Sequence, residues 1–351
     1  TRYRSSAASD VYKRQVAVLV TGGGGFLGRY IVEACVRRGE QVRIYGRREY
    51  PFARELGVRC HVGDVTDYDR LVEATRGVEV VYHAAAIAGI WGKWQTYYAT
   101  NTIGAHRVVE ACRANHVPKL VFTSSPSVTF GGEPQAGVDE TVPYPKRFLC
   151  PYPHTKALAE SHVLQANDPG RLLTCALRPH LIWGPRDGHL IPRLIDRAKS
   201  GQLRRVGDGQ NLVDMVYVEN AALAHLQAAD ALSAESPVAG SAYFISQGEP
   251  VNCWSWINEI LNLAEIEPIR KSIGFRAAWS IGAFLESIYK LSGKTDEPRM
   301  TRFLAAQLAL PHYFSIERAR RDFGYQPVVS KDEGMRRLAD WLHQDGGGTT
   351  S

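Results

Sequence analysis

Short apolar segments rich in Val and Ile alternate with amphipathic segments through the first half of the chain. Continuous apolar runs of four to six residues are typical of strands that are buried on both faces of a sheet. The predicted strands are Val16–Val20, Gln41–Tyr45, Val58–His61, Val78–His83, Lys119–Thr123 and Leu173–Leu177. Because strands that alternate with helices pair in parallel, the pattern predicts a parallel sheet with helices on both faces.

Between these strands, Leu27–Arg38 and Asn101–Asn115 carry apolar residues at helical spacing. Beyond about residue 180 the chain is richer in loops and amphipathic helices, with predicted helices at Asn252–Leu263 and Ile273–Leu291 and a tight turn at Gly207–Gly209. The fold class expected is therefore α/β, a Rossmann-type doubly wound sheet followed by a smaller C-terminal region.

The composition is that of a globular protein, with 44% hydrophobic and 22% charged residues. Residues 1–15 lack a signal-peptide core and precede an abrupt change at Val16, so we expect a non-native or disordered tail there and a disordered tail over 346–351. Half of the net charge of +6 lies in the first fifteen residues. No basic face remains, and we expect no nucleic-acid partner.

The six cysteines are scattered, without a close pair or a histidine at metal-ligand spacing. This distribution predicts a reduced, cytoplasmic compartment and no metal site. No apolar stretch is long enough to predict a membrane span. For the amphipathic segment Ile273–Leu291 we expect packing on the rest of the protein, with contact to a membrane surface as the alternative.

A glycine-rich loop, Thr21–Gly28, follows the first predicted strand and opens the first predicted helix. Glycine permits a tight turn, a close approach of the backbone to a pyrophosphate and close packing of helix on strand, and the helix N-terminus offers unpaired N–H groups. The predicted cofactor contacts of this loop are Gly22, Gly25, Phe26, Leu27 and Gly28. We therefore expect residues 16–180 to form a dinucleotide-binding domain to which later strands return, and residues 181–345 to form mainly a substrate-binding region.

The end of the second predicted strand indicates which dinucleotide is bound. NAD sites usually place an acidic residue there for the ribose 2′-hydroxyl, whereas this chain has Arg47 and Arg48. Guanidinium groups suit a 2′-phosphate by charge and by geometry, so the sequence favours NADPH over NAD. The alternative is that both arginines are merely solvated and Glu49 binds the ribose.

Tyr152 and Lys156 are four residues apart, hence on one face of a helix. A free tyrosine has a pKa of about 10, and we expect the nearby cation to lower the pKa of Tyr152 so that the phenol can donate a proton to a developing alkoxide. With the glycine loop upstream, this spacing resembles that of the extended short-chain dehydrogenase/reductase family.

The resemblance covers the chain from about Val16 and implies further roles. It implies that Ser125 holds the substrate carbonyl, with Ser124 as the rival, and that Lys156 also contacts the cofactor ribose. The other implied positions are the adenine-contacting pair Asp64 and Val65, the backbone stretch Ala84, Ala85 and Ala86 over the cofactor, the helix residue Asn101, and Arg178 and Pro179 beside the nicotinamide.

Within that family, Thr123–Val128 and Ala319–Pro327 resemble the 3-beta-hydroxysteroid and sterol-4-carboxylate dehydrogenases, and Leu177–Pro179, Leu181–Pro185 and Asn211–Asp214 resemble the bacterial 2-alkyl-3-oxoalkanoate reductases. This implies reduction of a bulky, largely apolar 3-oxo substrate. Candidate cations for a substrate carboxylate are Arg178, His180, His189 and Arg193, each more readily explained as structural or solvated.

The C-terminal half supplies aromatic rather than hydrogen-bonding surface, and we expect it to hold an apolar substrate. The aromatic residues on which this expectation rests are Trp254, Trp256, Phe275, Trp279, Phe284 and Tyr289. The alternatives are an NAD-linked nucleotide-sugar epimerase or dehydratase, and a non-catalytic dinucleotide sensor. For partners we expect a homodimer and, beyond it, contact with a membrane surface or another enzyme of the pathway.

Overall fold

The computed structural model describes residues 15–344, and the two tails expected at 1–15 and 346–351 lie, except for Gln15, outside that range. Its centre is a seven-stranded sheet in the order β12-β7-β5-β4-β1-β2-β3, in which every neighbouring pair is parallel. The strands are β1 (Ala17–Thr21), β2 (Gln41–Gly46), β3 (Arg59–Val62), β4 (Val80–His83), β5 (Lys119–Thr123), β7 (Leu173–Pro179) and β12 (Ser241–Ile245). The doubly wound α/β fold is confirmed, as are the six strands expected from the apolar runs.

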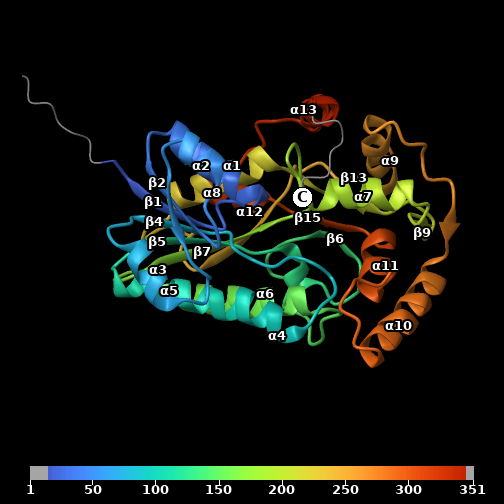
Figure 1. Ribbon diagram of the computed structural model, residues 1–351, viewed down its shortest axis with the longest axis horizontal. Coiled ribbons are helices and arrows are strands. Elements are labelled where there is room, and N and C mark those ends of the chain that lie inside the picture. The colour runs from blue at the N-terminus through green and yellow to red at the C-terminus, as the bar shows by residue number, and fades with distance from the viewer. Residues whose placement is uncertain (1–14, 345–351) are drawn as a thin grey trace, which may run out of the picture.

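Two layers of helices cover the sheet (Figure 1). Successive side chains of β1 point to opposite faces of the sheet. Val18 and Val20 pack in the apolar core on one face, and Leu19 packs in the core on the other. The first layer contains α1 (Phe26–Arg37) and α8 (Val218–Ala231), and the second contains α3 (Tyr68–Thr75), α5 (Gly104–Ala114) and α6 (Pro151–Gln165). The strands are apolar on both faces because both faces are covered.

A further apolar core lies in the C-terminal region, around the fully buried Trp183 and helices α7 (Leu190–Lys199) and α9 (Cys253–Leu263). A small four-stranded sheet extends beside it. In order, its strands are β13 (Val251–Asn252), β10 (Leu212–Val213), β15 (His312–Phe314) and β6 (Gln135–Val138). This sheet joins segments from both halves of the chain, and β12 and α8 return to the first region, as expected for later elements.

Helix α10 (Phe275–Leu291) packs against α11 (Arg302–Ala309) at the end of the molecule far from β1 and β2 (Figure 1). The remaining elements are α2 (Pro51–Glu55), α4 (Trp94–Tyr97), a π-helix (Tyr98–Ile103), a 3₁₀-helix (Pro126–Thr129), β8 (Ile182–Trp183), β9 (Arg205–Val206), β11 (Val216–Tyr217), β14 (Ser272–Ile273), α12 (Glu317–Phe323) and α13 (Lys331–Gln344).

Two helix starts differ from the expected ones. The segment expected to be helical from Asn101 is a π-helix up to Ile103 and becomes α-helical only at Gly104. Helix α10 begins at Phe275 because Ser272 and Ile273 pair with β9 as a short strand. Within residues 15–344, no helix combines the length and the apolarity needed to cross a membrane.

Three buried histidines make the stability of the fold depend on pH. Burial lowers the pKa of His83 to about 3, of His312 to about 3 and of His225 to about 4. In the unfolded chain a histidine titrates near 6.5, so the unfolded state binds more protons between about pH 6.5 and about pH 4. Stability is therefore lost as the pH falls through that window.

We predict that the free energy of unfolding, measured by urea denaturation, is lower at about pH 5 than at about pH 7.5. The variant His225→Gln should reduce this pH dependence, because it removes one of the buried groups. The exposed His343 provides the control, and His343→Gln should leave the dependence unchanged. Equal stability of the parent at both pH values would contradict the prediction.

Candidate active site

The strand order reverses between β1 and β4, and the loops that follow these two strands meet at that point. Gly22 has a φ of +70°, and a Cβ there would lie 2.7 Å from the Cα of Ala85. Its N–H donates to the carbonyl of Tyr45 at 2.9 Å. The glycine loop and the stretch Ala84–Ala86 are thus in direct backbone contact.

Gly28 lets α1 approach its own preceding loop. A Cβ on Gly28 would lie 2.2 Å from the carbonyl oxygen of Gly22, so no other residue fits without a backbone shift. Helix α1 then begins at Phe26 without a side-chain cap and without an acidic residue in its first turn. Its first N–H groups are available to an anion, which is the arrangement that binds a pyrophosphate.

Arg47 and Arg48 lie exposed just beyond the end of β2. Glu49, the alternative candidate for binding the ribose, forms an ion pair with Arg54 at 3.1 Å. Just beyond the next strand, β3, Asp64 accepts hydrogen bonds from Thr66, which lower the pKa of its carboxyl group. The cations therefore stand at the position where an NAD site usually has a carboxylate.

Lys156 lies one turn after Tyr152 on α6 and is 2% exposed. Its Nζ donates to the carbonyl oxygen of Thr123 at 2.5 Å and lies 4.0 Å from the ring centroid of Phe122. Burial lowers the pKa of Lys156 to about 7, although the charge of Glu160 opposes the shift. The ammonium group is thus held at the carboxyl end of β5 in an apolar setting.

The pKa of Tyr152 is shifted in the direction opposite to the expected one. Burial raises it above the ordinary value, and a hydrogen bond with Ser125 lowers it only in part. The expectation that the nearby cation lowers this pKa is not met in this structure, because the ammonium of Lys156 is directed at the carbonyl of Thr123. The phenol is consequently kept in its acid form at neutral pH.

The structure separates the two candidate serines. The Ser125 hydroxyl lies near enough to Tyr152 to lower the pKa of the phenol, lies 2.9 Å from the hydroxyl of Ser127 and caps the 3₁₀-helix. Ser124 is 4% exposed, its N–H donates to the carbonyl of Leu177, and its hydroxyl has no partner among the described residues. The hydroxyl beside the phenol is therefore that of Ser125.

Asn101 connects α6 to the loop after β4. Its amide oxygen accepts from the N–H of Ile87 at 2.8 Å, and its amide nitrogen donates to the carbonyl of Ile87 and to the hydroxyl of Thr155. The π-helix that carries Asn101 turns this side chain into the buried space between both elements, a common use of π-helical turns. Asn101 thus fixes the position of the helix that carries Tyr152.

His83 is a site residue to which the sequence analysis gave no role. Its Nδ1 lies 2.6 Å from the hydroxyl of Thr21, and the N–H of Ala85 donates to that same hydroxyl at 3.4 Å. The pair links the two loops that meet at the strand reversal. In the sequence, the position of His83 directly before the Ala84–Ala86 stretch could have indicated this role.

The four candidate cations for a substrate carboxylate prove to be structural or solvated, as expected. Arg178 is buried, and its Nε and Nη2 donate to the two carboxylate oxygens of Glu160. His180 bonds to Asp214 at 2.5 Å, and Arg193 forms an ion pair with Glu297. His189 is exposed immediately before α7.

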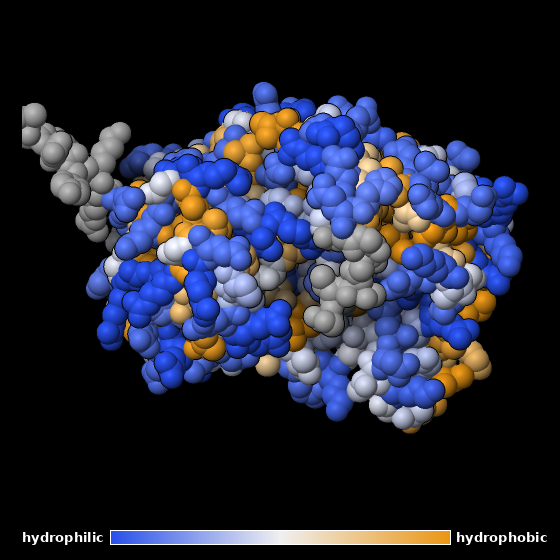
Figure 2. Space-filling model, turned by 45° about the horizontal axis from the view of Figure 1, so that its top comes forward, coloured by the Kyte–Doolittle hydropathy of each residue, from blue (hydrophilic) through white to orange (hydrophobic). Residues whose placement is uncertain are grey.

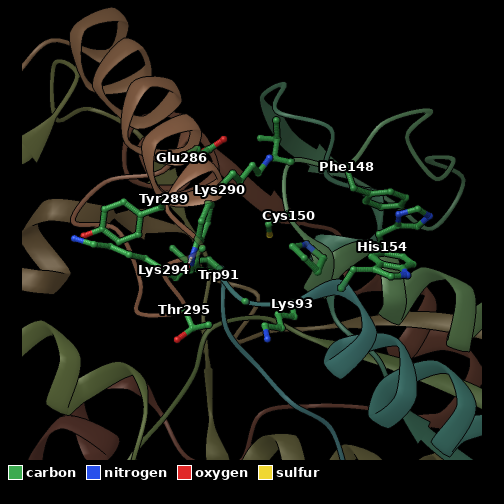
Figure 3. A pocket seen from close by; sticks show the side chains of 16 residues that line it. Trp91, Lys93, Phe148, Cys150, His154, Glu286, Tyr289, Lys290, Lys294 and Thr295 are labelled. Carbon is green, nitrogen blue, oxygen red and sulfur yellow. Dashed lines mark hydrogen bonds between the residues drawn. The ribbon is translucent and has the colours of Figure 1, made fainter.

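A cavity of about 470 Å³ lies beside the first turn of α6. Figure 3 shows its side chains around an open centre, with α10 and the segment after it on one side and Phe148 and His154 on the other. Most of the wall is apolar or aromatic. Its members are Ile90–Trp94, Phe148–Pro151, His154, Glu286, Tyr289, Lys290 and Gly293–Thr295.

Comparison with known proteins decides the family. Residues 19–273 match the 3-beta hydroxysteroid dehydrogenase/isomerase family. The chain belongs to this family. As a member it is an NAD(P)-dependent oxidoreductase of the dehydrogenase and reductase type, and the branch that the motifs resemble is confirmed.

Two relatives align with this chain over more than nine tenths of its length and of their own. A 2-alkyl-3-oxoalkanoate reductase from Stenotrophomonas maltophilia (strain K279a) is 48% identical over 324 residues, which are 92% of this chain and 98% of that protein. A decarboxylating sterol-4-alpha-carboxylate 3-dehydrogenase from Mus musculus is 34% identical over 340 residues, 95% of this chain and 93% of that protein.

Solved structures share the fold. The UDP-glucose 4-epimerase of Thermus thermophilus, in complex with NAD, has a TM-score of 0.70 and 25% identity, and the match covers 93% of this chain and 99% of that one. That structure and the family together support a nicotinamide dinucleotide as the cofactor. The residues around Gly22, Gly28 and the uncapped α1 fit such a group.

We predict that Tyr152→Phe lowers turnover by about two to four orders of magnitude, because it removes the hydroxyl that is expected to donate the proton and keeps the ring. Binding of NADPH, measured by fluorescence titration, should be nearly unchanged. Turnover within a few-fold of the parent would show that another group donates the proton.

The two serines supply a matched pair for the same assay. Ser125→Ala removes the hydroxyl that bonds to Tyr152 and should lower kcat, whereas Ser124→Ala removes a hydroxyl without a partner in residues 15–344 and should retain activity. The reverse pattern would assign the carbonyl contact to Ser124.

Proposed function

We propose that this protein is an NADPH-dependent ketone reductase that acts on a bulky, largely apolar 3-oxo substrate of the 2-alkyl-3-oxoalkanoate or sterol-like kind. The observation that carries the proposal is that the Ser125 hydroxyl lies close enough to Tyr152 to lower the pKa of the phenol, one helical turn from Lys156 and at the carboxyl edge of the sheet. A hydroxyl that can hold a carbonyl oxygen and a phenol that can protonate it stand together there.

In this mechanism the bound dinucleotide supplies a hydride to the carbonyl carbon. The hydroxyl of Ser125 donates a hydrogen bond to the substrate oxygen and orients it. Tyr152 then gives its phenolic proton to the same oxygen as negative charge develops there. Since the pKa of Tyr152 is raised above its ordinary value, the phenol carries this proton at neutral pH.

Lys156 acts through its position and its charge. Its Nζ is held by the carbonyl of Thr123, at the end of the strand that leads into Ser125. We assign it contact with the cofactor ribose and electrostatic support of the phenolic oxygen as the proton leaves. Because burial lowers its pKa to about 7, an anionic group nearby would favour its charged form.

The cavity beside α6 supports an apolar substrate. The aromatic side chains of Trp91, Phe148 and Tyr289 line it, together with Ile90 and Leu149. A nucleotide sugar would instead need many hydrogen-bonding groups to replace its hydration. The relative that is 48% identical is named for a 2-alkyl-3-oxoalkanoate, which agrees with such a wall.

The structure revises which aromatic residues face this cavity. Trp254 and Trp256 are buried in the C-terminal core, and Phe284 is 65% exposed on the outside of α10. Phe275 and Trp279 pack near the cavity without lining it, so only Tyr289 of the expected set is a wall residue. Phe284, which was expected to contact the substrate, does not line this cavity.

For the cofactor, we predict that the KM for NADPH is well below that for NADH, and that changing both Arg47 and Arg48 to Ala raises the KM for NADPH by about tenfold or more. Added salt should weaken the preference, because charges near solvent are screened. The exposed Arg171, remote from β2, provides the control as Arg171→Ala. Equal use of both dinucleotides by the parent would contradict the assignment.

For the substrate, we predict that kcat/KM rises with alkyl length across a series of 2-alkyl-3-oxo acids, since each buried methylene contributes about 0.8 kcal/mol. Trp91→Ala should flatten this rise by removing part of the wall. Phe284→Ala truncates an aromatic residue of α10 outside the cavity and should leave the slope unchanged. A flat profile in the parent, or turnover of a UDP-sugar, would favour the epimerase alternative.

A further inference from the structure

The glycine loop contains two glycines, Gly23 and Gly24, beyond the three that the dinucleotide motif requires. Gly23 lies against the buried side chain of Ile44, which leaves no room for a Cβ. Gly24 is partly exposed and its φ lies outside the left-handed region, so its backbone conformation does not itself require glycine. The reason for a glycine at this position must therefore come from a neighbouring residue.

That neighbour is the ring of Tyr50. A Cβ on Gly24 would lie 2.0 Å from Cε1 and from Cζ of Tyr50, so the hydroxyl end of the ring lies directly on the loop. A Cβ on Gly46, the last residue of β2, would lie 2.7 Å from the hydroxyl oxygen of the same tyrosine. The ring thus extends from the glycine loop to the end of β2, where a dinucleotide site usually binds the 2′ group of the ribose.

The position of Tyr50 is supported by a second aromatic residue. Tyr50 directly precedes α2, and its ring centroid lies 6.0 Å from that of Phe52. The guanidinium of Arg29 lies 4.4 Å from the centre of the Phe52 ring. Since Arg29 belongs to α1, the two aromatic residues are connected to the helix whose first turn is available to a pyrophosphate.

The surroundings of the Tyr50 hydroxyl suit an anion. Hydrophilic residues cover most of the end of the molecule at which Figure 1 draws β2 and α2 (Figure 2). The hydroxyl makes no hydrogen bond to any residue between 15 and 344. Arg48 forms no ion pair with that part of the chain, and its guanidinium lies 5.7 Å from the centre of the Tyr50 ring. A hydrogen-bond donor and a cation are therefore both available there.

We propose that Tyr50 is a cofactor-specificity residue that binds the ribose 2′-phosphate of NADPH together with Arg48. The phenol donates a hydrogen bond to a phosphate oxygen, and the ring positions the guanidinium for the same group. Gly24 is glycine because the ring occupies the space of a side chain. This inference rests on the preference for NADPH in the proposed function, and it adds an uncharged residue to the two arginines.

The test compares NADP⁺ with NAD⁺, which differ only in the 2′-phosphate, by isothermal titration calorimetry with the full chain. No substrate is present, so the result does not depend on turnover. Tyr50→Phe removes the hydroxyl and keeps the ring. We expect the Kd for NADP⁺ to rise about tenfold, because a hydrogen bond to a charged group is lost, and the Kd for NAD⁺ to stay within about twofold of the parent.

Tyr313→Phe provides the matched control. Tyr313 is also partly exposed, and its hydroxyl makes no hydrogen bond within residues 15–344, but it lies on β15 in the small sheet. Both dissociation constants of this variant should equal those of the parent.

Further variants test the ring and the glycine. Tyr50→Ala removes the support of Arg48, so Arg48→Ala should weaken NADP⁺ binding less in the Tyr50→Ala background than in the parent. Gly24→Ala should displace the ring and raise the Kd for NADP⁺. It should add little to the loss once Tyr50→Ala is present, because the ring that it displaces is then absent.

Three outcomes would overturn the proposal. A preference for NADP⁺ that Tyr50→Phe retains would overturn the role of the hydroxyl alone. Full additivity of Tyr50→Ala and Arg48→Ala would show that the ring does not position the guanidinium. Equal binding of NADP⁺ and NAD⁺ by the parent would instead overturn the cofactor assignment of the proposed function, and the role of Tyr50 with it.

Discussion

The active site depends on a contact in which backbone meets backbone with no side chain between. Gly22 lies against the backbone of Ala85, and Gly28 lies against the carbonyl oxygen of Gly22. Both contacts are so close that a Cβ atom on either glycine would clash with the neighbouring backbone. This close approach brings the loops after β1 and β4 together at the reversal of strand order and leaves the first turn of α1 uncapped. The shape of the cofactor cradle follows from that constraint.

Burial then sets the protonation of the groups around the cradle. His83, Tyr152 and Lys156 all have pKa values shifted toward their uncharged forms, because each is removed from water. A neutral phenol beside a serine hydroxyl is ready to donate a proton, which is what reduction of a ketone requires. The charge of Lys156 is the one most open to influence by an anion that binds nearby.

The C-terminal region adds a pocket and an outer face that come from one helix. The inner side of α10 is tied to α11 through Gly282 and Glu286, and the end of the helix lines the cavity beside α6. Its outer side keeps large apolar residues in solvent, at a cost that a monomeric protein usually avoids. The rotation of this single helix therefore decides which of its side chains line the cavity and which face solvent.

The sequence by itself determined the parallel sheet, the glycine loop and the Tyr152–Lys156 pair, because apolar periodicity and backbone freedom are local properties. Only the tertiary structure decided that Ser125 rather than Ser124 meets Tyr152, that Arg178 is occupied by Glu160, and that Phe284 points away from the cavity. It also decided the direction of the pKa shift of Tyr152. These outcomes depend on which distant segments surround a side chain and how completely they exclude water, and neither is encoded in spacing along the chain.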